Sequence, residues 1–299
     1  MKFKGSIFFS TLIAAFLLGA AYYPPKVNTE KEAILIQRML SGLNQLHYQP
    51  QSIDNSFSEK VYDLYLDRID GGRRWLTQED LNMLQSYKNQ IDDEANGGTY
   101  QFFNESVILL DAGIKKTQQY YRDILDQPFD FSKQEQFELD GDKKVFAKDD
   151  NQLKEYWRKA LKYETMTKLA GKVKAKAEGD EKLAAMSEAE LEADARKDVL
   201  KTFDDLYQRL YKLDRNDRLS DYLNAITSVF DPHTVYFEPK DKESFDIRMS
   251  GTLEGIGAQL QEDGNYTKVV RIIPGGPAWK QGELKANDLI VKVTQEDAE

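Results

Sequence analysis

The chain has 299 residues, of which 40% are hydrophobic and 31% are charged, and its formal net charge is -10 at pH 7. This length suggests about two domains, with enough apolar material for packed cores. The acidic balance argues against a nucleic-acid binder, which needs a basic face to neutralise phosphates. Because the chain contains no cysteine, disulfides, cysteine–zinc sites and cysteine nucleophiles are excluded.

The N-terminus has the pattern of an export signal. Lys2 and Lys4 form a short basic region, and a largely apolar run of about 15 residues follows from Ile7 to Ala21. A membrane-spanning helix needs about 20 such residues. We therefore predict a signal peptide over residues 1–21, cleaved beside its last small residues, and a mature chain that leaves the cytoplasm. The alternative is an uncleaved N-terminal anchor, through which alone the chain would associate with a membrane.

From Thr29 to Phe230 the apolar residues recur at helical spacing. Capping boxes, which begin helices, are predicted at three pairs of residues: Thr29 with Glu32, Ser56 with Glu59, and Ser187 with Glu190. One buried helix face is expected to carry Phe57, Val61, Leu64 and Tyr65. Further helices are expected over residues 100–126, 153–176 and 188–213, with a turn-rich segment over residues 129–148.

Residues 168–197 are rich in lysine, alanine and glutamate. A basic binding patch is one interpretation, but acidic residues are interleaved with the lysines. The composition favours an exposed helical hairpin with a loop near Gly179.

The pattern changes near Asp231, where helical spacing gives way to β-branched runs. Strands are expected over Val269–Ile273 and Leu289–Val293, and Gly264-Asn265 is typical of a turn between two strands. The predicted organisation is a helical domain over residues 22–230, then a linker and an incomplete β-rich module over residues 231–299.

The segment Leu253-Glu-Gly-Ile-Gly-Ala-Gln-Leu260 indicates a binding loop. Glycines on both sides of Ile256 let the backbone turn tightly and leave N–H groups pointing outward, an arrangement that suits a carboxylate. A strand beginning at Ala258 would present an open edge to an extended peptide. The candidate residues for binding a peptide tail are Leu253, Gly255, Ile256, Gly257, Ala258 and Leu260. The alternative is a glycine-rich turn into a hairpin, without a ligand.

A second motif, Pro274-Gly-Gly-Pro-Ala278, precedes a short helix and a strand, and the two motifs at this spacing resemble a PDZ domain of bacterial type. With Phe230-Asp-Pro-His-Thr-Val-Tyr-Phe237, the chain closely resembles the tail-specific, or C-terminal processing, proteases of the bacterial envelope. Residues 120–130 and 149–166 look like the helical domain that precedes PDZ in the long form of that family. The resemblance implies a mainly α N-terminal domain followed by a truncated α+β PDZ module.

The resemblance also implies a serine endopeptidase of the periplasm of a Gram-negative-type envelope. Such an enzyme recognises the nonpolar C-terminal tail of a substrate protein through PDZ and cleaves with a Ser–Lys dyad, in which a buried lysine accepts the serine proton. In this family the dyad lies downstream of PDZ, so we assign no catalytic residue. The chain also stops before the helix that forms the second wall of the PDZ groove. We therefore expect these 299 residues alone neither to cleave nor to bind tails tightly.

Other chemistry finds little support in the sequence. His233 beside Asp231 could belong to a Ser-His-Asp site, but a hydrogen bond within the turn is the favoured interpretation. His47 has no partner pattern, and two histidines with scattered carboxylates give no metal signature. No cofactor is implied. The rival functions are a non-enzymatic periplasmic PDZ adaptor and a helical partner-binding protein.

Overall fold

The structure is a computed structural model that describes residues 29–250, 255–264 and 266–294. The chain divides into two compact units, with the division between Tyr236 and Phe237. The predicted signal peptide lies outside the described residues, as does Leu253 of the predicted binding loop. Within the described part, no helix is both long enough and apolar enough to span a membrane.

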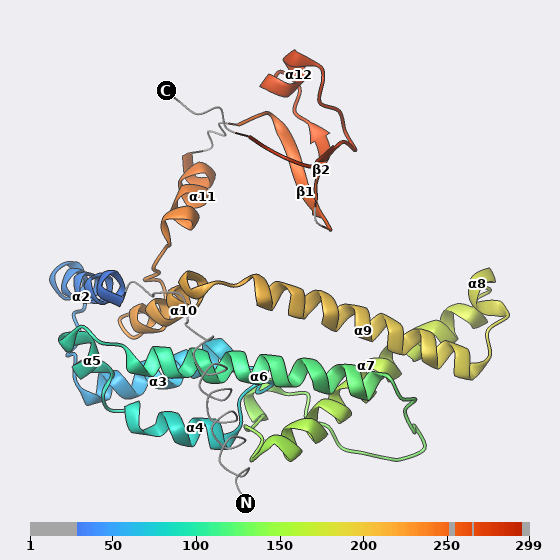
Figure 1. The fold of residues 1–299 in the computed structure, drawn as a ribbon, viewed down its shortest axis with the longest axis horizontal. Coiled ribbons are helices and arrows are strands. Elements are labelled where there is room, and N and C mark those ends of the chain that lie inside the picture. The colour runs from blue at the N-terminus through green and yellow to red at the C-terminus, as the bar shows by residue number, and fades with distance from the viewer. Residues whose placement is uncertain (1–28, 251–254, 265, 295–299) are drawn as a thin grey trace, which may run out of the picture. The chain divides into compact units, whose positions relative to one another are not determined.

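The first unit is helical, which confirms the predicted fold class of this part (Figure 1). The long helices α6 (Gln101–Leu125), α7 (Asp150–Ala177) and α9 (Glu188–Lys212) lie along one another, and α7 with α9 forms the predicted hairpin. The shorter elements are α2 (Thr29–Leu46), α3 (Asn55–Asp70), α4 (Gln78–Leu84), η1 (Gln85–Tyr87), α5 (Ile91–Gly97), η2 (Gly141–Lys143), α8 (Glu181–Ala184) and α10 (Arg215–Ser228).

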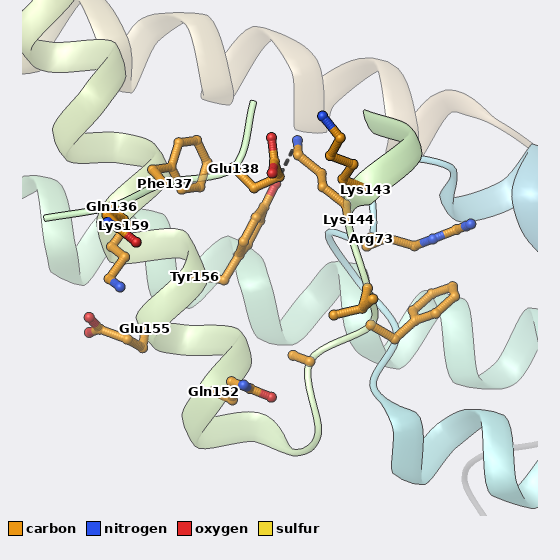
Figure 2. Close-up of a pocket in the computed structure, with 13 residues that line it drawn as sticks. Arg73, Gln136, Phe137, Glu138, Lys143, Lys144, Gln152, Glu155, Tyr156 and Lys159 are labelled. Carbon is orange, nitrogen blue, oxygen red and sulfur yellow. Dashed lines mark hydrogen bonds between the residues drawn. The ribbon is translucent and has the colours of Figure 1, made fainter. Parts of the chain in front are cut away.

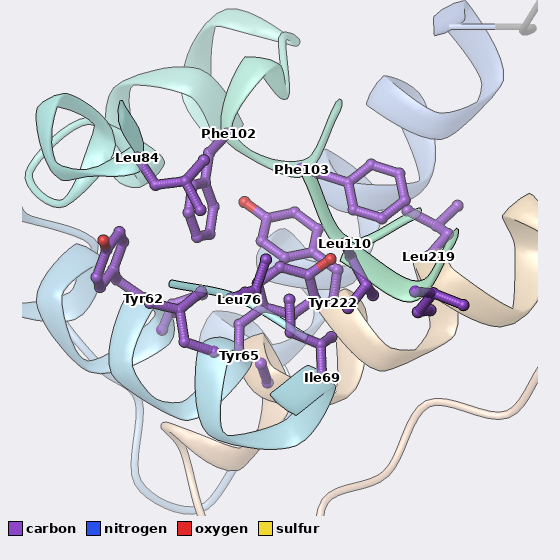
Figure 3. Packing of buried hydrophobic residues seen from close by; sticks show 14 of the residues in the cluster. Tyr62, Tyr65, Ile69, Leu76, Leu84, Phe102, Phe103, Leu110, Leu219 and Tyr222 are labelled. Carbon is purple, nitrogen blue, oxygen red and sulfur yellow. The ribbon is translucent and has the colours of Figure 1, made fainter. Parts of the chain in front are cut away.

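Buried aromatic rings join helices that are distant in sequence (Figure 3). Tyr222 of α10 stacks on Phe103 of α6, with 5.4 Å between ring centres, and meets Tyr65 of α3 edge to face at 5.2 Å. Trp157 of α7 contacts Phe203 of α9 at 5.4 Å and donates its indole N–H to the Arg74 carbonyl at 2.8 Å. Rings of this size contribute much of the buried apolar area of a core.

The loop between α3 and α4 is anchored by a buried carboxylate. Asp70 accepts the backbone N–H groups of Arg74, Trp75 and Leu76 at 2.7, 3.1 and 2.9 Å. Burial raises the pKa of Asp70 to about 6, although these hydrogen bonds favour the charged form. The same loop crosses α6 at Gly113, where a Cβ atom would lie 2.4 Å from the Trp75 carbonyl oxygen.

Several local predictions need correction. Ser187 and Glu190 form the predicted capping box of α9, but α3 is capped by Asp54 rather than by Ser56. Thr29 is already helical in α2, and Glu32 instead accepts from the Arg215 guanidinium at 2.8 Å. Leu64 is 41% exposed, because it lies off the face that its predicted companions bury.

The second unit contains α11 (Pro239–Ser250), β1 (Ala258–Asp263), β2 (Tyr266–Ile272), α12 (Pro277–Gln281) and β3 (Leu289–Ile290). The strands form an antiparallel sheet in the order β1-β2-β3, with a register irregularity between Gln259 and Leu260. The predicted α+β character is confirmed. The helix α11 was not predicted, and β3 is shorter than the expected strand.

Candidate functional site

The two glycine motifs meet through their backbones in the second unit. The Gly257 carbonyl accepts from Ile273 N–H, and the Ile256 carbonyl accepts from Ala278 N–H, both at 2.8 Å. Gly257 has φ +75°, and a Cβ atom there would lie 3.0 Å from Gly276 Cα. Glycine is therefore required at position 257 both by the left-handed backbone and by the close approach of Gly276.

The N–H donors of this loop take no part in those contacts. Within the described residues, the N–H groups of Ile256 and Gly257 donate no hydrogen bond. Two adjacent N–H groups without a partner are the kind of group that binds a carboxylate. Gly255 has open space around its Cα.

The strand β1 follows the loop directly and has β2 as its neighbour on one side. On its other side no described strand pairs with it, so its main chain is open to an added strand. Ile256 and Leu260 are 49% and 43% exposed, and Ile256 lines a hollow together with Pro277 and Leu284. The structure thus places Ile256, Gly257, Ala258 and Leu260 at one end and edge of the sheet. That they bind a peptide tail stays a prediction.

Both histidines are hydrogen-bonded to Asp231, His47 through its side chain and His233 through its backbone in the expected turn. His47, at the end of α2, lies with its Nε2 atom 2.6 Å from Oδ2 of Asp231. Asp231 also accepts the backbone N–H groups of His233 and Thr234 and the Thr234 hydroxyl. The sequence shows no partner pattern for His47, because 184 positions separate it from Asp231 and no local pattern links the two residues. His233 contributes its backbone N–H to the turn, while its side chain is exposed.

The hydrogen bond between His47 and Asp231 shifts the pKa values of both groups, but among the described residues no serine nucleophile is bonded to the pair. The hydrogen bond to Asp231 raises the pKa of His47, while the Thr234 hydroxyl and His47 hold the pKa of Asp231 well below its usual range. Among the described residues no serine hydroxyl is hydrogen-bonded to either histidine, and no group of three or more potential metal ligands is present. The pair therefore acts as a link between the end of α2 and the turn after α10.

Comparison with known families supports the interpretation of both units. Residues 39–240 match the model of the tail-specific protease N-terminal domain, and residues 245–299 match the PDZ domain model. Neither model describes a peptidase domain.

The chain is also similar to named proteases. It is 26% identical to the Tail-specific protease of Haemophilus influenzae over 298 residues, which cover 97% of this chain and 40% of that protein. It is 35% identical over 95 residues to the Carboxy-terminal processing protease CtpA of Bacillus subtilis, covering 31% of this chain and 20% of that protein. A Probable CtpA-like serine protease of Staphylococcus saprophyticus is 30% identical over 104 residues, or 33% of this chain and 21% of that protein.

The chain thus spans less than half the length of these relatives. The family model of the helical domain nevertheless covers most of the chain, and the helical unit and the PDZ region follow one another in the expected order. The chain belongs to the tail-specific protease family.

Proposed function

We propose that this chain is the substrate-recognising N-terminal part of a serine-type, C-terminal processing endopeptidase. In this proposal the loop 253–260 holds the nonpolar C-terminal tail of a substrate protein. The observation that carries the proposal is the junction of the Gly257 turn with the open edge of β1.

The recognition chemistry follows from that junction. The terminal carboxylate of the tail accepts hydrogen bonds from the N–H groups of Ile256 and Gly257. The tail then extends along β1 and pairs with it through its main chain, which gives affinity without dependence on sequence. The half-exposed side chains of Ile256 and Leu260 supply apolar contact, so a charged terminal side chain is disfavoured.

Cleavage takes place elsewhere in the parent protein. The relatives are proteases by name, and the family resemblance implies a Ser–Lys dyad in the part of those proteins that this chain does not match. A desolvated lysine there takes the serine proton, and the serine attacks the substrate carbonyl. The role of the present chain is to raise the local concentration of the substrate near that dyad.

We further propose that the chain works outside the cytoplasm, in the periplasm. The support is the basic-then-apolar pattern of residues 1–21. Sequencing the N-terminus of protein purified from the cell envelope tests this: a mature chain beginning near residue 21 is expected. A chain recovered from the cytoplasm with Met1 intact would contradict it.

The activity is tested with the full-length product of the gene. A carrier protein ending in Leu-Ala-Ala is compared with the same carrier ending in Asp-Asp-Asp, and we expect cleavage of the first at a rate at least about tenfold higher. The Gly257→Ala variant should remove that preference while a tail-less unfolded substrate is cut as before. Equal cleavage of both carriers would contradict tail recognition. Binding without cleavage by the full-length product would favour the adaptor.

A further inference from the structure

A cavity of about 310 Å³ opens in the first unit between α7 and the irregular segment that precedes it (Figure 2). Rings of Phe137, Phe146 and Tyr156 form its walls, and Arg73 lines it from the loop after α3. Apolar walls combined with a few polar groups are typical of pockets that bind a small molecule or a side chain.

The cavity is cationic although the chain is acidic. Its lining contains four cations, Arg73, Lys143, Lys144 and Lys159, against the two carboxylates Glu138 and Glu155. The chain as a whole carries a net charge of -10. A local excess of positive charge in such a chain attracts an anion selectively.

Two of these cations are already neutralised. Arg73 bonds to Asp67 at 3.0 Å, and Lys143 pairs with Asp140 at 3.0 Å. Lys159 interacts electrostatically with the Glu155 carboxylate of the same helix. In the described part of the chain, Lys144 lies within ion-pair distance of no carboxylate. The Lys144 amine therefore carries the charge available to a ligand.

Lys144 is held in place by the walls of the cavity. Its Nζ atom donates to the Tyr156 hydroxyl at 3.3 Å, and it lies 5.8 and 5.7 Å from the ring centres of Phe137 and Tyr156. Cation–π attraction of this kind orders the long side chain. An ammonium group has three donors, so Lys144 keeps two for a ligand.

Of the two carboxylates in the lining, Glu155 pairs with Arg158 at 2.7 Å, and Glu138 is the one that opposes an incoming anion. The Glu138 carboxylate lines the same cavity and accepts the Asp140 backbone N–H at 2.8 Å. Its charge repels a second carboxylate, while an amide at this position would keep the hydrogen bond and remove the repulsion. The effect of Glu138 on an anionic ligand is thus opposite in sign to that of Lys144.

We infer that this cavity, the Lys144 pocket, binds an acidic side chain that stands next to an aromatic one in a partner polypeptide. The carboxylate meets Lys144, and the neighbouring ring packs on Phe137 and Phe146. This site goes beyond the proposed function, because it lies in the first unit and binds an internal acidic side chain instead of a C-terminal tail.

The test is a titration of the 299-residue chain with acetyl-Glu-Phe-amide at low ionic strength, followed by amide NMR shifts. Acetyl-Gln-Phe-amide is the isosteric control, and neither peptide has the free C-terminus that the Gly257 loop would need. We expect the Glu peptide to bind at least about tenfold more tightly than the Gln peptide, since a charge-assisted bond is lost in the latter. Equal affinity, or no binding up to roughly 10 mM, would overturn the inference.

Three variants locate the site. Lys144→Gln should weaken the Glu peptide about tenfold and leave the Gln peptide unchanged, whereas Glu138→Gln should strengthen the Glu peptide about threefold. Lys201→Gln is the matched control, because Lys201 is an exposed lysine of α9 outside the cavity. An equal loss in Lys201→Gln, or the same shift pattern with inorganic phosphate, would show non-specific anion binding and overturn the proposal.

Discussion

The two units of the chain are held together in different ways. The helical unit buries large rings such as Trp157, Tyr65 and Tyr222, contributed by helices far apart in sequence. Among the described residues of the second unit, Val269 and Ala278 are the buried hydrophobic side chains. Its shape depends on ladder hydrogen bonds and on glycine geometry. Large side chains thus determine stability in the first unit, and backbone conformation determines the site in the second.

The largest effect is expected from Trp157→Ala. The variant loses ring contacts with Tyr121 and Phe203 and leaves the Arg74 carbonyl without its donor. We expect the free energy of unfolding to fall by about 3–5 kcal/mol, measured by urea denaturation of the helical signal. The matched control is Trp279→Ala in the second unit, where the ring is 58% exposed and a change within about 0.5 kcal/mol is expected. Similar losses in both variants would remove the contrast between the units.

A slightly smaller effect is expected from Asp70→Ala. Three backbone N–H groups, of which that of Leu76 is buried, lose their acceptor, and we expect a loss of about 3 kcal/mol in the free energy of unfolding. Asp70→Asn keeps one acceptor oxygen and should lose less.

The pH dependence of Asp70 sharpens this prediction. Its pKa is raised from 3.8 to about 6 on folding, so the native state binds the proton more tightly than the unfolded state. The contribution of Asp70 to stability therefore falls as the pH rises from about 4 to about 6. Relative to the Asp70→Asn variant, the unsubstituted chain should lose stability over this pH range. Denaturation at several pH values measures this loss. A parallel pH profile for the two proteins would contradict the assignment.

In the second unit, Gly257→Ala should act locally. The left-handed φ of +75° and the 3.0 Å approach of Gly276 Cα make a Cβ atom unfavourable by about 1–2 kcal/mol. We expect changed amide NMR signals around the loop and an unchanged unfolding midpoint of the helical unit. Gly255→Ala is the control, since no atom lies within 4 Å of its added Cβ. Loss of the helical unit in Gly257→Ala would contradict a local effect.

The smallest effect is expected from His47→Gln. The pKa of His47 is raised above 6.5, so its pairing stabilises the fold at lower pH and is lost as the pH rises through the folded value. The pKa of Asp231 is lowered from 3.8, so its contribution is lost as the pH falls through the folded value. The unsubstituted chain should therefore be more stable than the His47→Gln variant between about pH 4 and 6.5. This difference in stability should disappear at higher pH. His233→Gln is the control, and an equal change in it would argue against the His47–Asp231 link.

The sequence predicts features that depend on local pattern. The hairpin of α7 and α9, the cap at Ser187 and the short helix α12 after the Pro274 motif follow from spacing and residue type. The contact of His47 with Asp231 and the anchor at Asp70 depend on tertiary packing, which no local pattern reports. The cap of α3 was misplaced because Asp54 and Ser56 are both good capping residues. The close approach of Gly257 to Gly276 depends on the tertiary structure and is not reported by any local sequence pattern.

The most direct test of tail recognition is a titration of this chain with two forms of one peptide ending in Leu-Ala-Ala. One form has a free C-terminal carboxylate and the other is amidated. We predict that the free acid, with an affinity weaker than micromolar, shifts the amide signals of Ile256 and Gly257, and that the amidated form does not. Identical shifts with both forms, or shifts confined to the helical unit, would contradict the account.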